Sequence, residues 1–254
     1  MTLHLVRLPV DLRALAAFAV ANSASDDDGG YALHLALRQR FGEAGPQPFR
    51  LFAEHRAGPH LLAYTTDAEA LASIAGLPAV DALLGDLFRV PPTTQAMPAD
   101  WRTGQRLGFE VRARPVVRFG GRVRAARAER PGAWLNRGGK AAQEMDAFLA
   151  ACERAGEGIP VDRETVYRDW LTQRLAAAAE VESADLRLFR RVRTRRSTHG
   201  KRGSPRVEGP EAVIGGTLMV GDPALFAAML TRGVGRHAAF GYGMLLLSPP
   251  GRAG

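Results

Sequence analysis

Three polar side chains in the first fifth of the chain have the types and spacing of an acid-base site. Tyr31, His34 and Arg38 stand three and four residues apart, so a helix would place them along one edge. An imidazole titrates at about pH 6.5, so it can accept or donate a proton near neutrality. A phenol can orient a substrate or share that proton, and a guanidinium can stabilise charge developing on phosphate oxygens. We therefore take His34, Tyr31 and Arg38 as the candidate catalytic residues, with His34 as the acid or base.

His34 also has a purely structural interpretation. It borders the apolar stripe of Leu37 and Phe41, and a lone helix histidine beside such residues more often lies at the edge of a core. Asp28 and the glycines before Tyr31 predict that His34 lies in the first helical turn, where free N–H groups favour a phosphate. The run Asp26-Asp27-Asp28 is expected to be a solvated cap, because three consecutive carboxylates do not converge on a metal without distant partners.

A glycine-rich segment near the C-terminus, GVGRHAAFGYG over residues 233–243, could bind phosphate through its backbone. Its glycines are Gly233, Gly235, Gly241 and Gly243. Glycines let N–H groups approach a phosphodiester closely, and Arg236 and His237 add charge. The order helix, loop, strand differs from the strand, loop, helix of a dinucleotide site, and the Lys-Ser/Thr of a P-loop is missing. We therefore expect no nucleotide cofactor; a connector that binds no ligand is the alternative.

Arginines dominate the second half of the chain and indicate a polyanionic partner. Residues 187–206 contain nine Lys/Arg and no acid, which exceeds what a solvated edge strand needs. Alternate residues of a strand share a face, so we expect Arg187, Arg191, Arg193 and Arg195 to point the same way. Arginine suits bidentate contacts with phosphate and guanine. The predicted nucleic-acid contacts are Arg112, Arg114, Arg187, Arg191, Arg193, Arg195, Arg196, Lys201, Arg202, Gly233, Gly235, Arg236, His237, Gly241 and Gly243.

Composition and charge narrow the class of protein. The 254 residues are 46% hydrophobic and 24% charged, which is typical of a globular chain and excludes extensive disorder. The net charge of +8 is uneven, because residues 1–100 hold 7 Lys/Arg against 11 Asp/Glu, a net of −4, and the remainder carries +12. The single cysteine, Cys152, excludes an internal disulfide, and no Cys/His spacing predicts a metal. With no run of about 20 apolar residues and no secretion signal, we expect a cytoplasmic protein that does not contact membranes.

The elements that must position these residues follow the order β-α-β-β-α-β twice. In the first round we expect strands over 2–10, 49–55, 61–66 and 87–95, helices over 12–21 and 31–41, and a helix from Asp67 to about residue 84 that breaks near Gly76. In the second we expect strands over 107–119, 184–196, 206–220 and 242–247, helices over 161–179 and 222–231, and a basic insertion over 120–158. The predicted fold class is α+β, with two tandem ferredoxin-like (RRM-like) domains over 1–100 and 101–254 and a linker near 98–104.

Four features together resemble the CRISPR-associated endoribonuclease of type I-E systems, the CasE family. They are the duplicated plan, Tyr31-x-x-His34, the helix VYRDWLTQRL with its following basic strand, and GVGRHAAFGYGMLLL. The resemblance covers nearly the whole chain. It implies a tandem ferredoxin-like protein that binds the stem-loop of each repeat in CRISPR precursor RNA and cuts at the base of the stem without a metal.

The resemblance further implies that a ribose 2′-hydroxyl attacks the adjacent phosphate, giving a 5′-hydroxyl and a 2′,3′-cyclic phosphate or 3′-phosphate. Such proteins stay bound to the mature guide and join the other subunits of the Cascade complex. The chain departs from the family where Ala238 stands in place of a common Lys or Arg, which bears on RNA affinity.

Two other functions fit parts of the same pattern. A non-catalytic RNA-binding subunit of a CRISPR ribonucleoprotein complex would use the same modules but leave a hairpin intact. A small-molecule enzyme could use the glycine-rich segment for a nucleotide, although no acidic ribose partner or metal-binding pair accompanies it.

Overall fold

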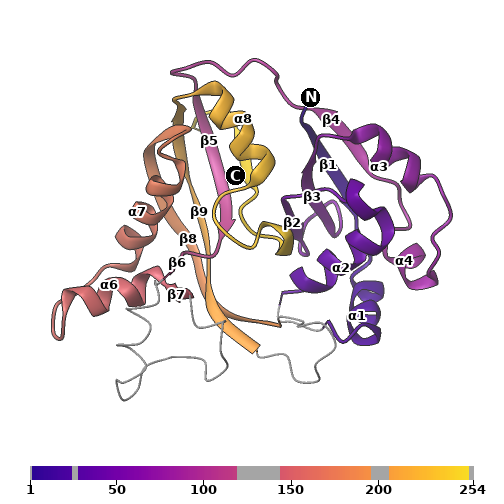
Figure 1. Ribbon diagram of the computed structural model, residues 1–254, viewed down its shortest axis with the longest axis horizontal. Helices are drawn as coiled ribbons and strands as arrows, with labels where there is room; N and C mark the ends of the chain where they lie inside the picture. Colours follow the sequence, from indigo (N-terminus) through magenta and orange to yellow (C-terminus); the bar gives the residue numbers. More distant parts are fainter. Residues whose placement is uncertain (1, 25–27, 119–143, 196–205, 252–254) are drawn as a thin grey trace.

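The computed structural model describes residues 2–24, 28–118, 144–195 and 206–251 (Figure 1). These residues form two four-stranded antiparallel sheets that lie side by side, each with its own helices (Figure 1). Numbered by their order along the chain, the strands of both sheets follow the spatial order 4-1-3-2. The prediction of an α+β fold with two ferredoxin-like units is therefore confirmed.

The N-terminal sheet has the order β2-β3-β1-β4. Its strands are β1 (His4–Pro9), β2 (Phe49–Phe52), β3 (His60–Thr65) and β4 (Thr93–Ala96), and its helices are α1 (Leu12–Ala21), α2 (Gly30–Phe41), η1 (Gly42–Ala44), α3 (Ala68–Ala75) and α4 (Ala82–Leu87). Aspartates begin three of these helices: Asp11, Asp67 and Asp81 accept hydrogen bonds from the first free N–H groups of α1, α3 and α4. The core joins Leu33 and Leu37 of α2 to Val6 and Leu8 of β1.

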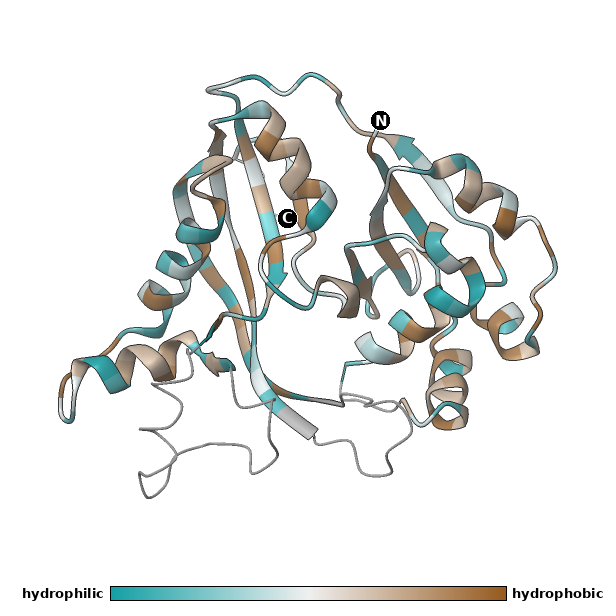
Figure 2. Ribbon diagram, in the orientation of Figure 1, coloured by the Kyte–Doolittle hydropathy of each residue, from teal (hydrophilic) through white to brown (hydrophobic). Residues whose placement is uncertain are grey.

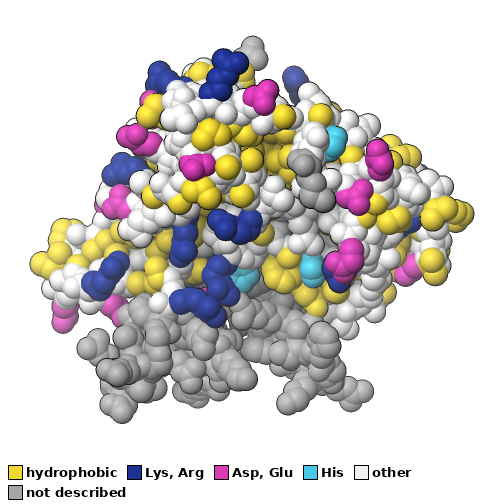
Figure 3. Space-filling view, turned by 45° about the horizontal axis from the view of Figure 1, so that its top comes forward, with side chains coloured by type: hydrophobic (Ala, Val, Ile, Leu, Met, Phe, Trp, Pro, Cys, Tyr) yellow, Lys and Arg dark blue, Asp and Glu magenta, His cyan; other side chains and the backbone are white. Residues whose placement is uncertain are grey.

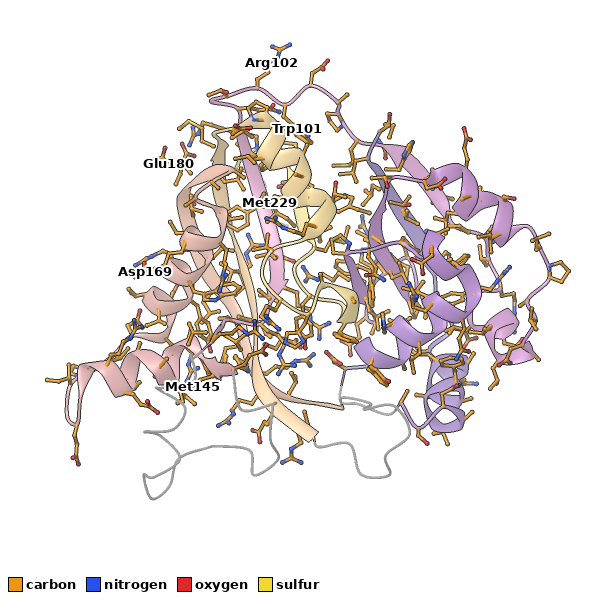
Figure 4. All side chains as sticks on the ribbon, viewed as in Figure 1. Trp101, Arg102, Met145, Asp169, Glu180 and Met229 are labelled. Atoms are coloured by element: carbon orange, nitrogen blue, oxygen red, sulfur yellow. The ribbon has the colours of Figure 1, made fainter. Side chains whose placement is uncertain are left out.

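The C-terminal sheet has the order β10-β5-β9-β8. Its elements are β5 (Arg106–Ala113), β6 (Val116–Arg118), β7 (Glu144–Asp146), α6 (Ala147–Ala155), α7 (Arg163–Leu175), β8 (Ala179–Arg195), β9 (Arg206–Val220), α8 (Pro223–Arg232), η3 (Ala238–Phe240) and β10 (Leu245–Ser248). Trp101, in the segment before β5, packs on Phe226 of α8 in a core that also holds Met229 (Figure 4). Strands β6 and β7 form a separate two-stranded sheet beside it.

Several predicted boundaries were wrong for identifiable reasons. The strand predicted over 87–95 shrinks to β4, because Leu87 instead ends a helix capped by Asp81. The strand predicted over 107–119 is broken between β5 and β6, where Pro115 cannot donate a ladder hydrogen bond. Strand β8 begins at Ala179, a position predicted to be helical. The domain division at residue 100 stays a prediction; the strands of the two sheets occupy 4–96 and 106–248.

The two halves share a packed interface. The hydroxyl of Tyr64 in β3 is buried and donates a 2.8 Å hydrogen bond to the carbonyl of Leu245 in β10. Leu5 and Leu62 of the N-terminal sheet pack against the core of the C-terminal half. Hydrophobic residues are visible along β1, β3, β9 and α8 (Figure 2). None of the described helices has the length and apolar character needed to cross a membrane.

Candidate active site and nucleic-acid interface

Helix α2 and the glycine-rich segment, which are about two hundred residues apart in the sequence, meet at Phe240. The ring of His34 lies 4.9 Å from the Phe240 ring, centroid to centroid, in an edge-on arrangement, and Tyr31 lies 6.0 Å from it. His237 approaches the same ring at 6.1 Å. Gly30 fits closely under this segment, because a Cβ there would overlap the carbonyl of Phe240. The fold thus brings Tyr31 and His34 together with the segment predicted to bind phosphate.

The surroundings of His34 favour a neutral imidazole. Burial lowers the pKa of His34 below 6.5, and the charge of Arg38 lowers it further. A hydrogen bond with the backbone of Ala239 raises this pKa in part. The Nδ1 atom of His34 is buried, and no group among the described residues forms a hydrogen bond with it. A neutral ring at pH 7 can take a proton, which is the property a general base needs. Arg38 itself forms a 2.9 Å ion pair with the exposed Glu43.

The prediction that His34 lies in the first turn was wrong. Helix α2 begins at Gly30, after a left-handed N-cap at Gly29, so His34 occupies the second turn. The free N–H groups of the helix end therefore do not surround this side chain.

The solvated cap predicted for Asp28 was also wrong, since its side chain is only 1% exposed. Its Oδ2 atom lies 2.8 Å from Nη2 of Arg112 and 2.7 Å from the hydroxyl of Tyr242. Its Oδ1 atom accepts the N–H of Gly30 at 3.1 Å. Asp26 and Asp27 lie outside the described residues. Asp28 therefore joins the start of α2 to the C-terminal half.

A second carboxylate, Glu211 of β9, completes this buried cluster. Its Oε2 atom lies 2.5 Å from Nη2 of Arg112, and its Oε1 atom lies 2.7 Å from Nε of Arg190. Burial raises the pKa of Glu211, but the hydrogen bonds and charges of the two arginines outweigh it, so the pKa is lowered. Burial and the neighbouring Asp28 raise the pKa of Tyr242, which stays protonated. We call Asp28, Arg112, Arg190, Glu211 and Tyr242 the interdomain cluster.

Arg112 and Arg114, both predicted to contact nucleic acid, are buried. The guanidinium of Arg112 also lies 4.5 Å from the Tyr242 ring centroid, and that of Arg114 lies 5.7 Å from it. Their role in binding nucleic acid stays a prediction, one that requires these groups to become accessible. The sequence signal for a buried ion pair was an acid and a base two residues apart in one predicted strand, Glu110 and Arg112, since alternate residues of a strand share a face.

The arginines of β8 do not share one face as predicted, because the strand carries a bulge. The register with β9 shifts between Leu186 and Leu188, which places Arg187 out of the regular alternation. Arg187 pairs at 2.5 Å with Glu110, which also binds Arg50 at 2.5 Å, on the face that holds Arg112 and Arg190.

Arg190 shares the face of Arg187, whereas Arg191 and Arg193 follow the regular alternation and face the opposite side. Arg191 lies 3.0 Å from Glu208, and Arg193 is exposed. Arg195 ends β8, and Arg196, Lys201 and Arg202 lie outside the described residues. Most Lys and Arg side chains on the face drawn in Figure 3 lie over the C-terminal half. Both faces of β8 therefore present arginines.

The glycine-rich segment owes its shape to close packing. The N–H of Val234 donates to the carbonyl of Gly243, and the N–H of Gly243 donates to that of Arg112. Gly235, at φ 79°, lies against the Trp170 ring, where a Cβ would be crowded. Gly233 and Gly241 likewise have positive φ. Phosphate binding by these glycines stays a prediction.

Glu144 of β7 contacts both Arg236 and His237 of the segment. Its Oε1 atom lies 2.6 Å from Nε of Arg236, and its Oε2 atom lies 3.1 Å from Nε2 of His237. Arg236 and His237 are thereby oriented beside Phe240. Among the described residues, no group of three His, Cys, Asp or Glu side chains could hold a metal ion.

Comparisons with known proteins agree with this architecture. A sequence profile of the family described as CRISPR associated protein matches residues 3–249, and no match was found among curated proteins. A structure of the CRISPR endoribonuclease Cse3 bound to a 19-nucleotide RNA has a TM-score of 0.61 at 19% identity, covering 98% of this chain and 100% of the other. Thermus thermophilus Cse3 bound to an RNA representing a pre-cleavage complex gives 0.59 at 18%, with the same coverage. Cas6e from Escherichia coli K-12 gives 0.52 at 19%, again over 98% and 100%.

Proposed function

From the premise that the chain belongs to the CRISPR-associated protein family, we propose that it is an endoribonuclease that processes CRISPR precursor RNA. It binds the stem-loop of each repeat and cuts at the base of the stem. The similar Cse3 structures carry RNA, one of them in a pre-cleavage state, which supports this substrate class.

The position of His34 carries the proposal. A neutral imidazole at the junction of α2 and the glycine-rich segment stands beside a half that supplies most of the arginines. The catalytic base thus comes from the N-terminal half, and most of the RNA-binding arginines come from the C-terminal half. A merely structural histidine does not need a position beside the glycine-rich segment.

The reaction needs only groups that the protein and the RNA supply. His34 removes the proton from a ribose 2′-hydroxyl, and the oxygen attacks the neighbouring phosphorus in line with the 5′-oxygen. The phosphorus–5′-oxygen bond breaks and a 2′,3′-cyclic phosphate forms. The 5′-oxygen takes up a proton from water, and His34 then returns the proton it removed to the solvent. Tyr31 orients the ribose or phosphate, and Arg38 stabilises negative charge on the phosphate oxygens. Alignment of the bound RNA supplies much of the remaining acceleration.

The experiment is cleavage of a synthetic repeat hairpin in the presence of EDTA. We expect one cut, with a 5′-hydroxyl on one product and a cyclic phosphate on the other. The matched control is a hairpin with a single 2′-deoxyribose at the cut site, which we expect to bind equally but to stay intact. Cleavage of the deoxy hairpin, or cleavage that EDTA abolishes, would contradict this mechanism.

The alternative is a non-catalytic RNA-binding subunit of a CRISPR ribonucleoprotein complex. The arginines of the C-terminal half would serve such a subunit as well as they serve an enzyme, because they bind RNA without taking part in its cleavage. It predicts a stable complex with an uncut hairpin at every pH.

The same arginine-rich half explains why we propose that the product stays bound. Contacts with phosphates outside the cut do not change during cleavage, so the mature guide dissociates slowly and the protein joins the other Cascade subunits in the cytoplasm. Gel filtration after cleavage should show the hairpin product eluting with the protein.

A further inference from the structure

The interdomain cluster contains a carboxylate that the proposed chemistry does not use. Asp28 precedes His34 by six residues and lies just before the N-cap of the same helix. With a side chain 1% exposed, it cannot touch RNA in this arrangement. Its contacts instead join three parts of the chain: Gly30 of α2, Arg112 of β5, and Tyr242 beside β10.

These contacts hold one end of α2 against the C-terminal half. The two oxygens of Asp28 have different partners: Oδ1 accepts the N–H of Gly30 in α2, and Oδ2 binds Arg112 in the C-terminal half. The charges are matched, because Asp28 and Glu211 face Arg112 and Arg190. Buried pairs of this kind are costly to break, since removing one partner leaves an uncompensated charge.

The ion pairs of the interdomain cluster also extend from Asp28 to Arg190, on an arginine-bearing face of β8. Arg190 is 52% exposed and binds the far oxygen of Glu211, whose near oxygen binds Arg112. RNA held on that face is therefore connected to the start of α2 by three consecutive ion pairs. In-line attack tolerates little error, and a misplacement of about 1 Å can cost about 10²-fold in rate.

We infer that Asp28 is a positioning residue: it holds α2 on the C-terminal sheet and so places His34 on the RNA that this half binds. The inference rests on the proposed endoribonuclease function. It assigns Asp28 no contact with the substrate and no proton transfer.

The test is Asp28→Asn, which keeps an acceptor for Gly30 and removes the charge that binds Arg112. Single-turnover cleavage with saturating protein should slow by about 10²-fold, while the Kd for the hairpin stays within about twofold. Saturating protein matters because it separates a slower step from a smaller folded fraction. Asp67→Asn is the matched control, since Asp67 caps α3 with the same chemistry and should leave the rate unchanged.

Tyr242→Phe removes only the hydroxyl that binds Asp28. If both residues act through the same interdomain contacts, the double variant Asp28→Asn/Tyr242→Phe should cleave RNA no more slowly than Asp28→Asn alone. Wild-type cleavage by Asp28→Asn, an equal loss of rate and affinity, or an equal loss in Asp67→Asn would overturn the inference.

Hydrogen exchange tests these interdomain contacts without any activity. The amides in the first turn of α2 should exchange faster in Asp28→Asn and in Tyr242→Phe than in the unmodified protein. Unchanged exchange would overturn the inference, whereas absence of cleavage by the unmodified protein would instead overturn the proposed function.

Discussion

Replacing Phe240 tests whether the glycine-rich segment holds the catalytic helix. The ring contacts His34 and Tyr31 from the other half of the chain, and a Phe240→Leu change keeps a hydrophobic side chain while removing the aromatic contacts. Aromatic pairs contribute about 0.5–1.5 kcal/mol each. Because Phe240 is only half-buried, we expect the free energy of unfolding to fall by about 1 kcal/mol for Phe240→Leu and about 2 kcal/mol for Phe240→Ala, less than for a fully buried ring.

The effect on cleavage should be larger than the effect on stability. Without the ring, His34 and Tyr31 lose their aromatic contact with the segment, and loss of alignment should slow single-turnover cleavage by about 10²-fold in Phe240→Ala. Urea unfolding and cleavage of a repeat hairpin by saturating protein measure the two effects, with RNA affinity as the control. If Phe240→Ala unfolds at the same urea concentration and cleaves at the wild-type rate, the ring does not organise the site and the reasoning fails.

Three further changes test the charges. Arg38→Gln should move the rising limb of the pH–rate profile to higher pH, because loss of the cation raises the pKa of His34 and the neutral imidazole then forms at a higher pH. A limb that does not move would show that Arg38 does not influence the site. Arg191→Gln should reduce the slope of log affinity against log salt by about 0.7–0.9, whereas an unchanged slope would place Arg191 outside the RNA contacts. Glu211→Gln should lower the free energy of unfolding by about 3–5 kcal/mol at pH 7. Because folding lowers the pKa of Glu211, its ionised carboxylate stabilises the protein at pH values above the ordinary Glu pKa. The difference in unfolding free energy between wild type and Glu211→Gln should therefore shrink as the pH falls below about 4.3. A difference that does not change with pH would exclude the ion pairs as its cause.

Local signals in the sequence predict most of the elements. Apolar spacing locates α1 with the bounds that the structure has, and Asp67 marks the start of α3 through its side-chain cap. The strand predicted over 206–220 coincides with β9. In each case neighbouring residues decide the conformation, through periodicity or through hydrogen bonds within one turn.

Long-range pairing explains what the sequence did not reveal. Asp28 is buried because Arg112, 84 residues away, and Tyr242, 214 residues away, neutralise and bind it. Three consecutive aspartates contain no signal for such partners. The bulge at Arg187 likewise depends on pairing with β9 and reverses the face on which that side chain lies. The contact between Phe240 and His34 exists only after both halves have folded and packed.

We propose that His34 acts as the base on RNA that is bound by the arginine-rich half. Single-turnover cleavage of a repeat hairpin by His34→Gln measures it most directly, with His55→Gln as a matched control at a histidine outside the site. We expect His34→Gln to bind the hairpin with the wild-type Kd and to cleave about 10²- to 10⁴-fold more slowly, while His55→Gln cleaves normally. Cleavage by His34→Gln at the wild-type rate would show that His34 is not the base.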